Sequence, residues 1–160
     1  MRRHAPAALL LALAACEGTI IDIDKDDLVG YEDWKRVDAV GEVPGHGDSY
    51  RIIYANETAE DRVSEFDGEW GPGTVIVKEI RERDGDQPGD VRYLGIMRFL
   101  DRGDTPDGAE LFNLLEDEPY GWLFTYLDQD IDSDEEYRAS CWNDCHVAAP
   151  YAGAFLNYAE

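Results

Sequence analysis

A run of β-branched residues, Thr74-Val75-Ile76-Val77-Lys78-Glu79-Ile80, decides the fold class. It directly follows the turn sequence Gly71-Pro72-Gly73, so the pattern predicts a strand that begins at a tight turn. Outward from this run, β-branched and aromatic content predicts three more strands, at residues 50–54, 91–100 and 121–127. The Gly-, Asp- and Pro-containing stretch 84–90 predicts a hairpin-like loop between two of the strands.

Few helices are expected. Residues 56–63 predict a short helix with Asn56 as its N-cap, and helical turns are expected near 33–37 and 137–146. Together these elements predict an α+β fold, mostly an antiparallel β-sheet with a few flanking helices. The elements alone indicate no activity.

The charge of the chain argues against several partners. The chain has 160 residues, which is the size of one domain, and 36 acidic residues against 14 basic ones give a net charge of −22. Nucleic-acid binding is not expected, because it needs clustered Lys and Arg. Adsorption to anionic lipid is disfavoured for the same reason. No apolar run reaches the roughly 18 residues that a membrane span needs.

The N-terminus has the features of an export signal. Arg2-Arg3 precedes the apolar run 7–15, which is too short to span a membrane but suits the hydrophobic region of a secretory signal. The run ends in Leu13-Ala14-Ala15-Cys16, which resembles a bacterial lipobox and implies lipidation of Cys16. Glu17 after the cysteine favours the outer membrane. The alternative is a buried N-terminal helix with an accidental cysteine.

This signal sets the expected organisation and location. Residues 1–15 are expected to be a lipoprotein signal peptide, 16–30 the lipidated N-terminus with an acidic tether, and 31–160 the folded domain. The protein would be periplasmic and attached through its lipid to the outer membrane or cell surface. That compartment is oxidising, so the two remaining cysteines are expected to be paired or modified. For the acidic stretch, an edge strand is the alternative to a tether.

A second motif lies near the C-terminus, in Ser140-Cys141-Trp142-Asn143-Asp144-Cys145-His146. This C-x3-C-H sequence has one residue more than C-x-x-C-H, the usual attachment site of c-type haem. In such a site both thiols form thioethers with the haem vinyl groups, and the histidine binds the iron. An extra residue can bulge out while both sulfurs still reach. A local Cys141–Cys145 disulfide is one alternative, and zinc, which lacks a fourth ligand here, is another.

The order of motifs along the chain resembles the cytochrome P-460 family, which includes cytochrome c′-beta. The matching residues are Trp34, Gly45-His46-Gly47, stretches 51–56 and 73–79, Met97-Arg98, Trp122, the late Cys-His motif, and a tail with Tyr151 and Phe155. The resemblance covers residues 31–160. It implies a mostly antiparallel sheet with helices that holds one haem, whose distal side faces a pocket in the sheet.

The resemblance also implies roles for particular residues. Cys141 and Cys145 would attach one covalent haem c, and His146 would be the axial ligand of its iron. Lys78 matches the lysine that is joined to the haem ring in hydroxylamine-oxidising members; the alternative is an ordinary solvated strand lysine. Strand alternation places Lys78 on the same face as apolar residues such as Ile76, which favours a pocket.

Further candidates would act on a ligand of the haem. Arg51 is a candidate distal cation for a nitrogen-oxide ligand, with an edge-strand salt bridge as the alternative. Hydroxylamine oxidation also needs a carboxylate that accepts protons. Glu79 is our candidate for this role, and two acids after the third predicted strand, Asp101 and Asp104, are also available. His46 is expected to order the turn between its two glycines rather than to bind iron.

Three functions remain open at this point. The first is a redox enzyme that oxidises hydroxylamine or a related nitrogen-oxide species and passes electrons to a soluble acceptor. The second is a non-catalytic haem protein that binds nitric oxide or transfers electrons, like cytochrome c′-beta. The third is a haem-free domain with a Cys141–Cys145 disulfide. The expected partners are a small nitrogen-oxide or gas ligand, a soluble redox partner, the membrane through the lipid alone, and a second copy of the chain, since relatives are often dimers.

Overall fold

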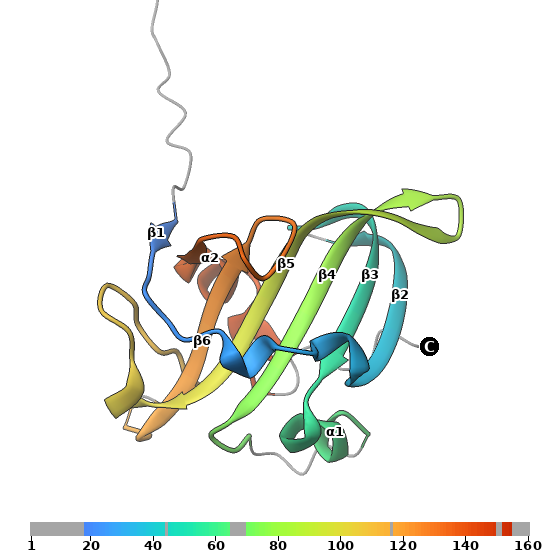
Figure 1. The fold of residues 1–160 in the computed structure, drawn as a ribbon. Coiled ribbons are helices and arrows are strands. Elements are labelled where there is room, and N and C mark those ends of the chain that lie inside the picture. The colour runs from blue at the N-terminus through green and yellow to red at the C-terminus, as the bar shows by residue number, and fades with distance from the viewer. Residues whose placement is uncertain (1–17, 44, 65–69, 116, 150–151, 155–160) are drawn as a thin grey trace, which may run out of the picture.

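A seven-stranded antiparallel sheet organises the chain in this computed structural model, which describes residues 18–43, 45–64, 70–115, 117–149 and 152–154 (Figure 1). In the order in which they lie side by side, the strands are β1 (Thr19–Ile20), β7 (Glu135–Tyr137), β6 (Tyr120–Leu127), β5 (Gln87–Asp101), β4 (Thr74–Asp84), β3 (Gly47–Ala55) and β2 (Lys35–Val43). Each neighbouring pair is antiparallel. The predicted fold class is confirmed.

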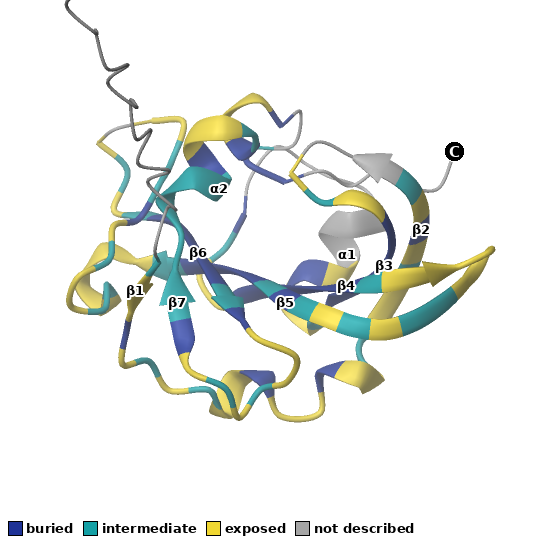
Figure 2. Cartoon of the chain, turned by 90° about the horizontal axis from the view of Figure 1, so that it is seen from above, coloured by how far each residue is buried: buried dark blue, intermediate teal, exposed yellow. Residues whose placement is uncertain are grey.

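The helices are short and flank the sheet. They are the α-helices α1 (Glu57–Ser64) and α2 (Ala139–Asp144), and the 3-10 helices η1 (Asp26–Leu28), η2 (Tyr31–Asp33), η3 (Arg102–Asp104) and η4 (His146–Ala148). Seen from above in Figure 2, α2 lies on one side of the sheet, and the N-terminal segment that follows β1 lies on the other. No helix in the described ranges has the length and apolar character needed to cross a membrane.

Strand β4 lies inside the sheet and buries both of its faces. Val75 and Val77 pack with Leu28 and Tyr31 of the N-terminal segment in one core cluster. Ile76 faces the other way, into a second cluster with Trp122 and Trp142 that lies under α2. A strand that is buried on both faces has a continuous run of β-branched residues, which explains why the sequence predicts this strand clearly.

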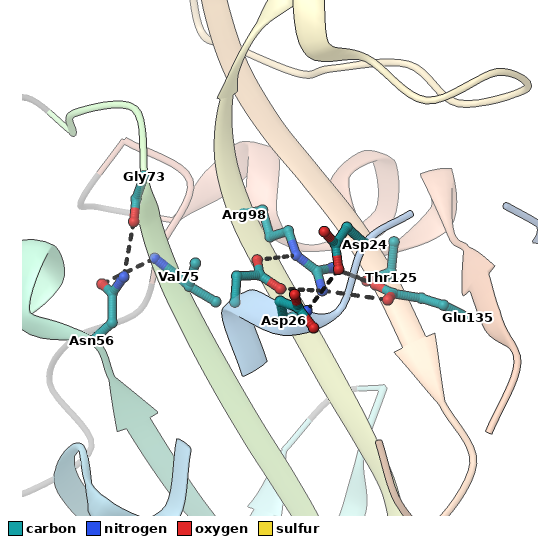
Figure 3. Close-up of polar contacts among 9 residues, drawn as sticks. Asp24, Asp26, Asn56, Gly73, Val75, Arg98, Thr125 and Glu135 are labelled. Atoms are coloured by element: carbon teal, nitrogen blue, oxygen red, sulfur yellow. Dashed lines mark hydrogen bonds and ion pairs between the residues drawn. The ribbon is translucent and has the colours of Figure 1, made fainter. Parts of the chain in front are cut away.

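Asn56 joins the start of α1 to the start of β4, as the close-up in Figure 3 shows. Its Oδ1 accepts hydrogen bonds from the backbone N–H groups of Ala59, at 3.2 Å, and Val75, at 3.1 Å. Its Nδ2 donates to the carbonyl of Gly73 at 2.8 Å. The predicted N-cap is therefore confirmed, and the same side chain also fixes the turn before β4.

One segment differs from the sequence-based expectations, and for another the structure favours one of two alternatives. A helical turn lies near the expected place, since η2 includes Asp33, but the expectation is wrong for residues 35–37, where β2 pairs with β3. The acidic N-terminal stretch, given two alternatives above, contains the edge strand β1 and then packs onto the sheet through the fully buried Leu28. In both places, pairing or packing with distant residues outweighs the local preference of the sequence.

A buried arginine ties this N-terminal segment to the sheet (Figure 3). Arg98 lies on the side of β5 that faces η1, and its Nε donates to Asp27 Oδ2 at 2.7 Å. Its Nη1 also forms an ion pair with Glu135, which accepts a hydrogen bond from Thr125. Since the side chains of Arg98 and Glu135 are each only 1% exposed, the two charges depend on one another for their burial.

Candidate functional site

A cavity of about 410 Å³ lies where the sheet, the β2–β3 turn and the C-terminal segment meet. Its volume is within the usual range for small-molecule and cofactor sites. The turn contributes Gly45 and His46. The remaining lining residues come from the sheet and the C-terminal segment, and they are Tyr93, Gly95, Thr125, Tyr126, Arg138, Ser140, Cys141, Asp144, Cys145 and His146. All three residues of the Cys-His motif therefore reach one cavity.

Trp142, between the two cysteines, fixes α2 to the core. Its ring stacks on Phe112, with centroids 5.7 Å apart and planes 13° apart, and it also contacts Phe124. The helix ends just before Cys145, whose backbone N–H bonds to the carbonyl of Cys141. One closed turn of helix thus accommodates the extra residue of the motif while both cysteines line the cavity.

Both cysteines are half-buried free thiols in this structure. Burial raises the pKa of the Cys141 thiol above its ordinary value, although the charges of Arg138 and Lys78 act in the opposite direction. Among the residues that the structure describes, no group of three His, Cys, Asp or Glu side chains is arranged to hold a metal ion. The zinc alternative therefore gains no support from the geometry.

His146 is buried at the start of η4 and is oriented by the chain tail. Its Nδ1 lies 2.7 Å from the carbonyl oxygen of Gly153, which can only accept, so Nδ1 carries the hydrogen. Nε2 is then the nitrogen with the lone pair, as metal-binding histidines require. Burial, assisted by the charge of Lys78, lowers the pKa of His146 to about 4, which keeps the imidazole neutral. Its ring packs on Phe124, with centroids 4.7 Å apart.

Gly153 is a site residue that sequence reasoning missed. Its φ of +94° suits glycine, and a Cβ there would lie 2.7 Å from the Trp142 ring and 2.8 Å from Trp122. Trp122 Nε1 also donates to the carbonyl of Ala152 at 2.7 Å, which fixes the segment that accepts the His146 bond. A single glycine in a tail gives no sequence signal for this role. Tyr151 and Phe155, named in the resemblance, lie outside the described residues, as does Cys16.

Lys78 is buried on the side of the sheet that faces α2. It is 8% exposed, and it pairs across the sheet with Ile53 of β3 and Gly95 of β5. Burial lowers its pKa to about 8; the charge of Arg51 adds to this effect, and the two cysteines oppose it. Lys78 is therefore not a solvated surface lysine, and it lies within electrostatic range of the Cys-His motif.

Two glycines leave room where a side chain would enter the cavity. Gly95 faces it from β5 opposite Lys78, and a Cβ there would meet only the Lys78 carbonyl, at 3.9 Å. A Cβ on Gly45 would lie 4.0 Å from Cys145 Sγ. A covalently attached haem needs free space, two thiols and an oriented neutral imidazole. The cavity has all of these, so the residues present fit that cofactor.

Glu79 and Arg51 are not brought to the cavity. Glu79 lies on the opposite side of β4 from Lys78, where it accepts a hydrogen bond from the Tyr31 hydroxyl at 2.7 Å and pairs with Arg81 at 2.6 Å. Arg51 is buried on the Lys78 side, but its Nη1 donates to the Gly41 carbonyl of the β2–β3 hairpin at 2.9 Å. Neither lines the cavity, and neither does Lys78, which instead pairs across the sheet with the lining residue Gly95.

The remaining carboxylate candidates also lie elsewhere. Asp101, at the end of β5, and Asp104, in η3, are both exposed. Met97, which the family resemblance also named, packs in the core beside Ile76. Asp144 does line the cavity, but it is exposed. Instead, the cavity has a pair of side chains that the sequence did not single out for chemistry, namely His46 and Tyr93.

These features define a small α+β domain with a cofactor cavity between a β-sheet and a C-terminal Cys-His segment. The sequence profile of the Cytochrome P460 family matches residues 29–152, which is most of the chain. The chain belongs to the cytochrome P460 family, and the resemblance inferred from the motifs is confirmed. The family implies a haem cofactor and a haem-binding cytochrome. No curated protein matches the chain.

Proposed function

We propose that this chain is an exported, lipid-anchored cytochrome with one covalent haem c that oxidises hydroxylamine or a related nitrogen-oxide species. The observation that carries the proposal is the convergence of Cys141, Cys145 and His146 on one cavity, with buried Lys78 on the sheet beside it. Haem would supply an iron that changes oxidation state and has an open position for a small ligand.

The motif residues would hold the cofactor. The S–H groups of Cys141 and Cys145 would each add across one vinyl group of the haem, giving two thioether bonds. His146 would bind the iron through Nε2, because its Nδ1–H donates to the Gly153 carbonyl. The stacked Trp142 keeps this segment against the core, so the ligand atoms need little reorganisation when the cofactor binds.

Lys78 is the residue that favours an enzyme over a simple ligand-binding protein. A buried amine with a lowered pKa has a larger neutral fraction than a surface lysine, and only the neutral amine is nucleophilic. A bond from its nitrogen to a ring carbon would replace one N–H and one C–H bond, so it would need a two-electron oxidant such as a peroxide. A bond to the ring would distort the macrocycle and alter its electronic properties. Oxidation of hydroxylamine to nitric oxide would release three protons and three electrons, and the electrons would pass to a soluble acceptor.

Turnover by the haem-loaded protein tests this proposal. We expect hydroxylamine to reduce an artificial electron acceptor in the presence of the protein, and Lys78→Arg to abolish this while haem stays attached at the cysteines. Lys35→Arg, at an exposed strand position, is the matched control and keeps full turnover. A wild-type protein with an ordinary c-type spectrum and no turnover would contradict the proposal.

The position of Glu79 favours a second candidate, a non-catalytic haem protein that binds nitric oxide or transfers electrons. Because Glu79 faces Tyr31 and Arg81 on the other side of the sheet, the predicted proton acceptor is missing from the cavity. In this case the protein binds nitric oxide without turnover. Its mass equals that of the chain plus haem with two thioethers, and its spectrum lacks the change that a lysine bond causes.

Export and lipid attachment are proposed from the first residues of the chain, which include Cys16. Fatty-acid labelling in a bacterial host tests them: wild-type protein should carry the label in the membrane fraction, whereas Cys16→Ser should be unlabelled. Label-free wild-type protein would contradict the anchor. The same preparations, run on a sizing column, show whether two copies associate.

A further inference from the structure

The turn between β2 and β3 places a histidine against a tyrosine in the cavity wall. His46 Nδ1 and the Tyr93 hydroxyl oxygen are 2.7 Å apart, which is a good hydrogen bond. Gly45 and Gly47 flank the histidine with φ values of +82° and +65°, so the turn needs glycine at both places. The expected role of His46 in ordering the turn explains the two glycines that flank it. It does not explain why the His46 ring points toward Tyr93.

The pair lies between the sheet and the cysteines. Tyr93 comes from β5, where its ring packs on Tyr126 with centroids 5.0 Å apart. On the other side, a Cβ on Gly45 would lie 4.0 Å from Cys145 Sγ, so the turn that carries His46 is close to the motif. His46, Tyr93 and His146 all line the cavity, so a cofactor bound there would lie close to both the pair and the motif histidine.

The pair acts as a neutral hydrogen-bonding group. When the phenol donates to Nδ1, the imidazole presents Nε2–H as a donor; when Nδ1–H donates to the phenol, Nε2 is an acceptor and the phenol hydrogen becomes a donor. Burial, together with the charges of Lys78, Arg51 and Arg92, lowers the pKa of His46 to about 3. The surroundings thus favour recognition by hydrogen bonds over recognition by an ion pair.

We propose that His46 and Tyr93 form the ligand-recognition element of the cofactor cavity. They hydrogen-bond a small ligand at the open position of the cofactor and make the site prefer ligands with N–H or O–H groups over carbon monoxide. This inference rests on the proposed function, because it needs haem in the cavity, and it deepens that function by naming the residues that select the ligand.

The ratio of two ligand affinities tests the inference in the haem-loaded protein. The probes are hydroxylamine, measured without an electron acceptor, and carbon monoxide, measured on the reduced protein. Loss of one hydrogen bond should lower the hydroxylamine-to-carbon monoxide ratio by roughly three- to tenfold in Tyr93→Phe and in His46→Leu. His46→Gln, which retains a donor and an acceptor, should recover part of the ratio. The stretching frequency of bound carbon monoxide should shift in Tyr93→Phe.

Tyr50→Phe is the matched control. It also removes a hydroxyl from a buried tyrosine; this hydroxyl donates to Asp38 at 2.8 Å, but Tyr50 belongs to the core cluster on the other side of the sheet. This control variant should leave the ratio at the wild-type value. Unchanged ratios in both Tyr93→Phe and His46→Leu would overturn the inference. It is also overturned if His46→Leu converts low-spin iron to high-spin iron, because His46 would then be a second iron ligand.

The outcomes separate this inference from the proposed function. If the wild-type protein shows the ratio effect but does not turn over hydroxylamine, the recognition element stands and the enzymatic function fails. If it turns over hydroxylamine and the variants keep the wild-type ratio, the function stands and the inference fails. A protein that contains no haem, as shown by a haem stain before any ligand is added, overturns both.

Discussion

At the scale of single residues, the site depends on one backbone carbonyl more than on any side chain outside the motif. The Gly153 carbonyl orients His146, and the glycine itself fits between the rings of Trp122 and Trp142 because it has no Cβ. The motif would supply the atoms that bind the haem, and this tail position sets the direction in which the imidazole points.

Gly153→Ala should therefore destabilise the protein by about 1–3 kcal/mol, because the new methyl group overlaps two tryptophan rings at a positive φ. Urea denaturation followed by tryptophan fluorescence measures this change. Gly103→Ala is the control, since a Cβ there meets no atom within 4 Å. Equal midpoints for the two variants would show that the tail does not pack as described.

Because Lys78 is buried, the free energy of unfolding of the haem-free chain should depend on pH. The pKa of Lys78 is about 8 in the folded chain, against an ordinary value of 10.5 for a solvated lysine. The unfolded chain therefore binds more protons between these pH values, and the free energy of unfolding rises with pH there. Below about pH 8 both states are protonated, and the cost of the buried charge is fully present.

Lys78→Met should consequently be more stable than wild type near neutral pH, and the difference should shrink as the pH is raised toward about 9.5. Urea titrations across this pH range measure the free energy of unfolding of both proteins. Subtracting one from the other removes the contribution of the tyrosines, which both proteins share. A constant difference between the two curves would contradict the burial of this amine.

At the scale of elements, the N-terminal segment is held to the sheet by charge as well as by apolar packing. Arg98 of β5 pairs with Asp27 of η1 and with Glu135 of β7, so one guanidinium joins three parts of the chain. Met97-Arg98 was named for its place in the family resemblance, and the structure gives Arg98 a structural role on the side of the sheet that faces η1.

Arg98→Met should cost about 3–5 kcal/mol, because it leaves the carboxylate of Glu135 buried without its cation. Arg83→Met is the matched control: Arg83 also pairs with two acids, Asp48 and Asp86, but at an exposed position, and its loss should leave the denaturation midpoint unchanged. Similar losses in both variants would contradict a special role for the buried pair.

The elements also show what the sequence could predict. Strand β4 was recognisable because the turn before it and the β-branched run agree. Strand β2 was not, because Lys35, Arg36 and Asp38 give it the polar character of a solvated segment, and pairing with β3 decides its conformation. Similarly, β7 has three residues and depends on β1 and β6 for its existence as a strand.

At the scale of the whole molecule, the site combines segments that are distant in sequence. The Cys-His motif was predictable because its spacing carries chemistry, and Lys78 was predictable from strand alternation together with the family resemblance. The His46–Tyr93 contact was not, because it depends on how the β2–β3 turn folds over β5. Glu79 illustrates the opposite case: it is one residue from Lys78, and the same alternation turns it to the other side of the sheet.

The proposed function rests above all on covalent attachment of haem by Cys141 and Cys145. Intact-mass measurement and haem staining on a denaturing gel test it directly, with the protein matured in a host that has the c-type maturation machinery. The account predicts a mass of chain plus one haem for wild type and loss of the covalent stain in the Cys141→Ser, Cys145→Ser double variant. Unstained wild-type protein with the two sulfurs joined to each other would contradict it.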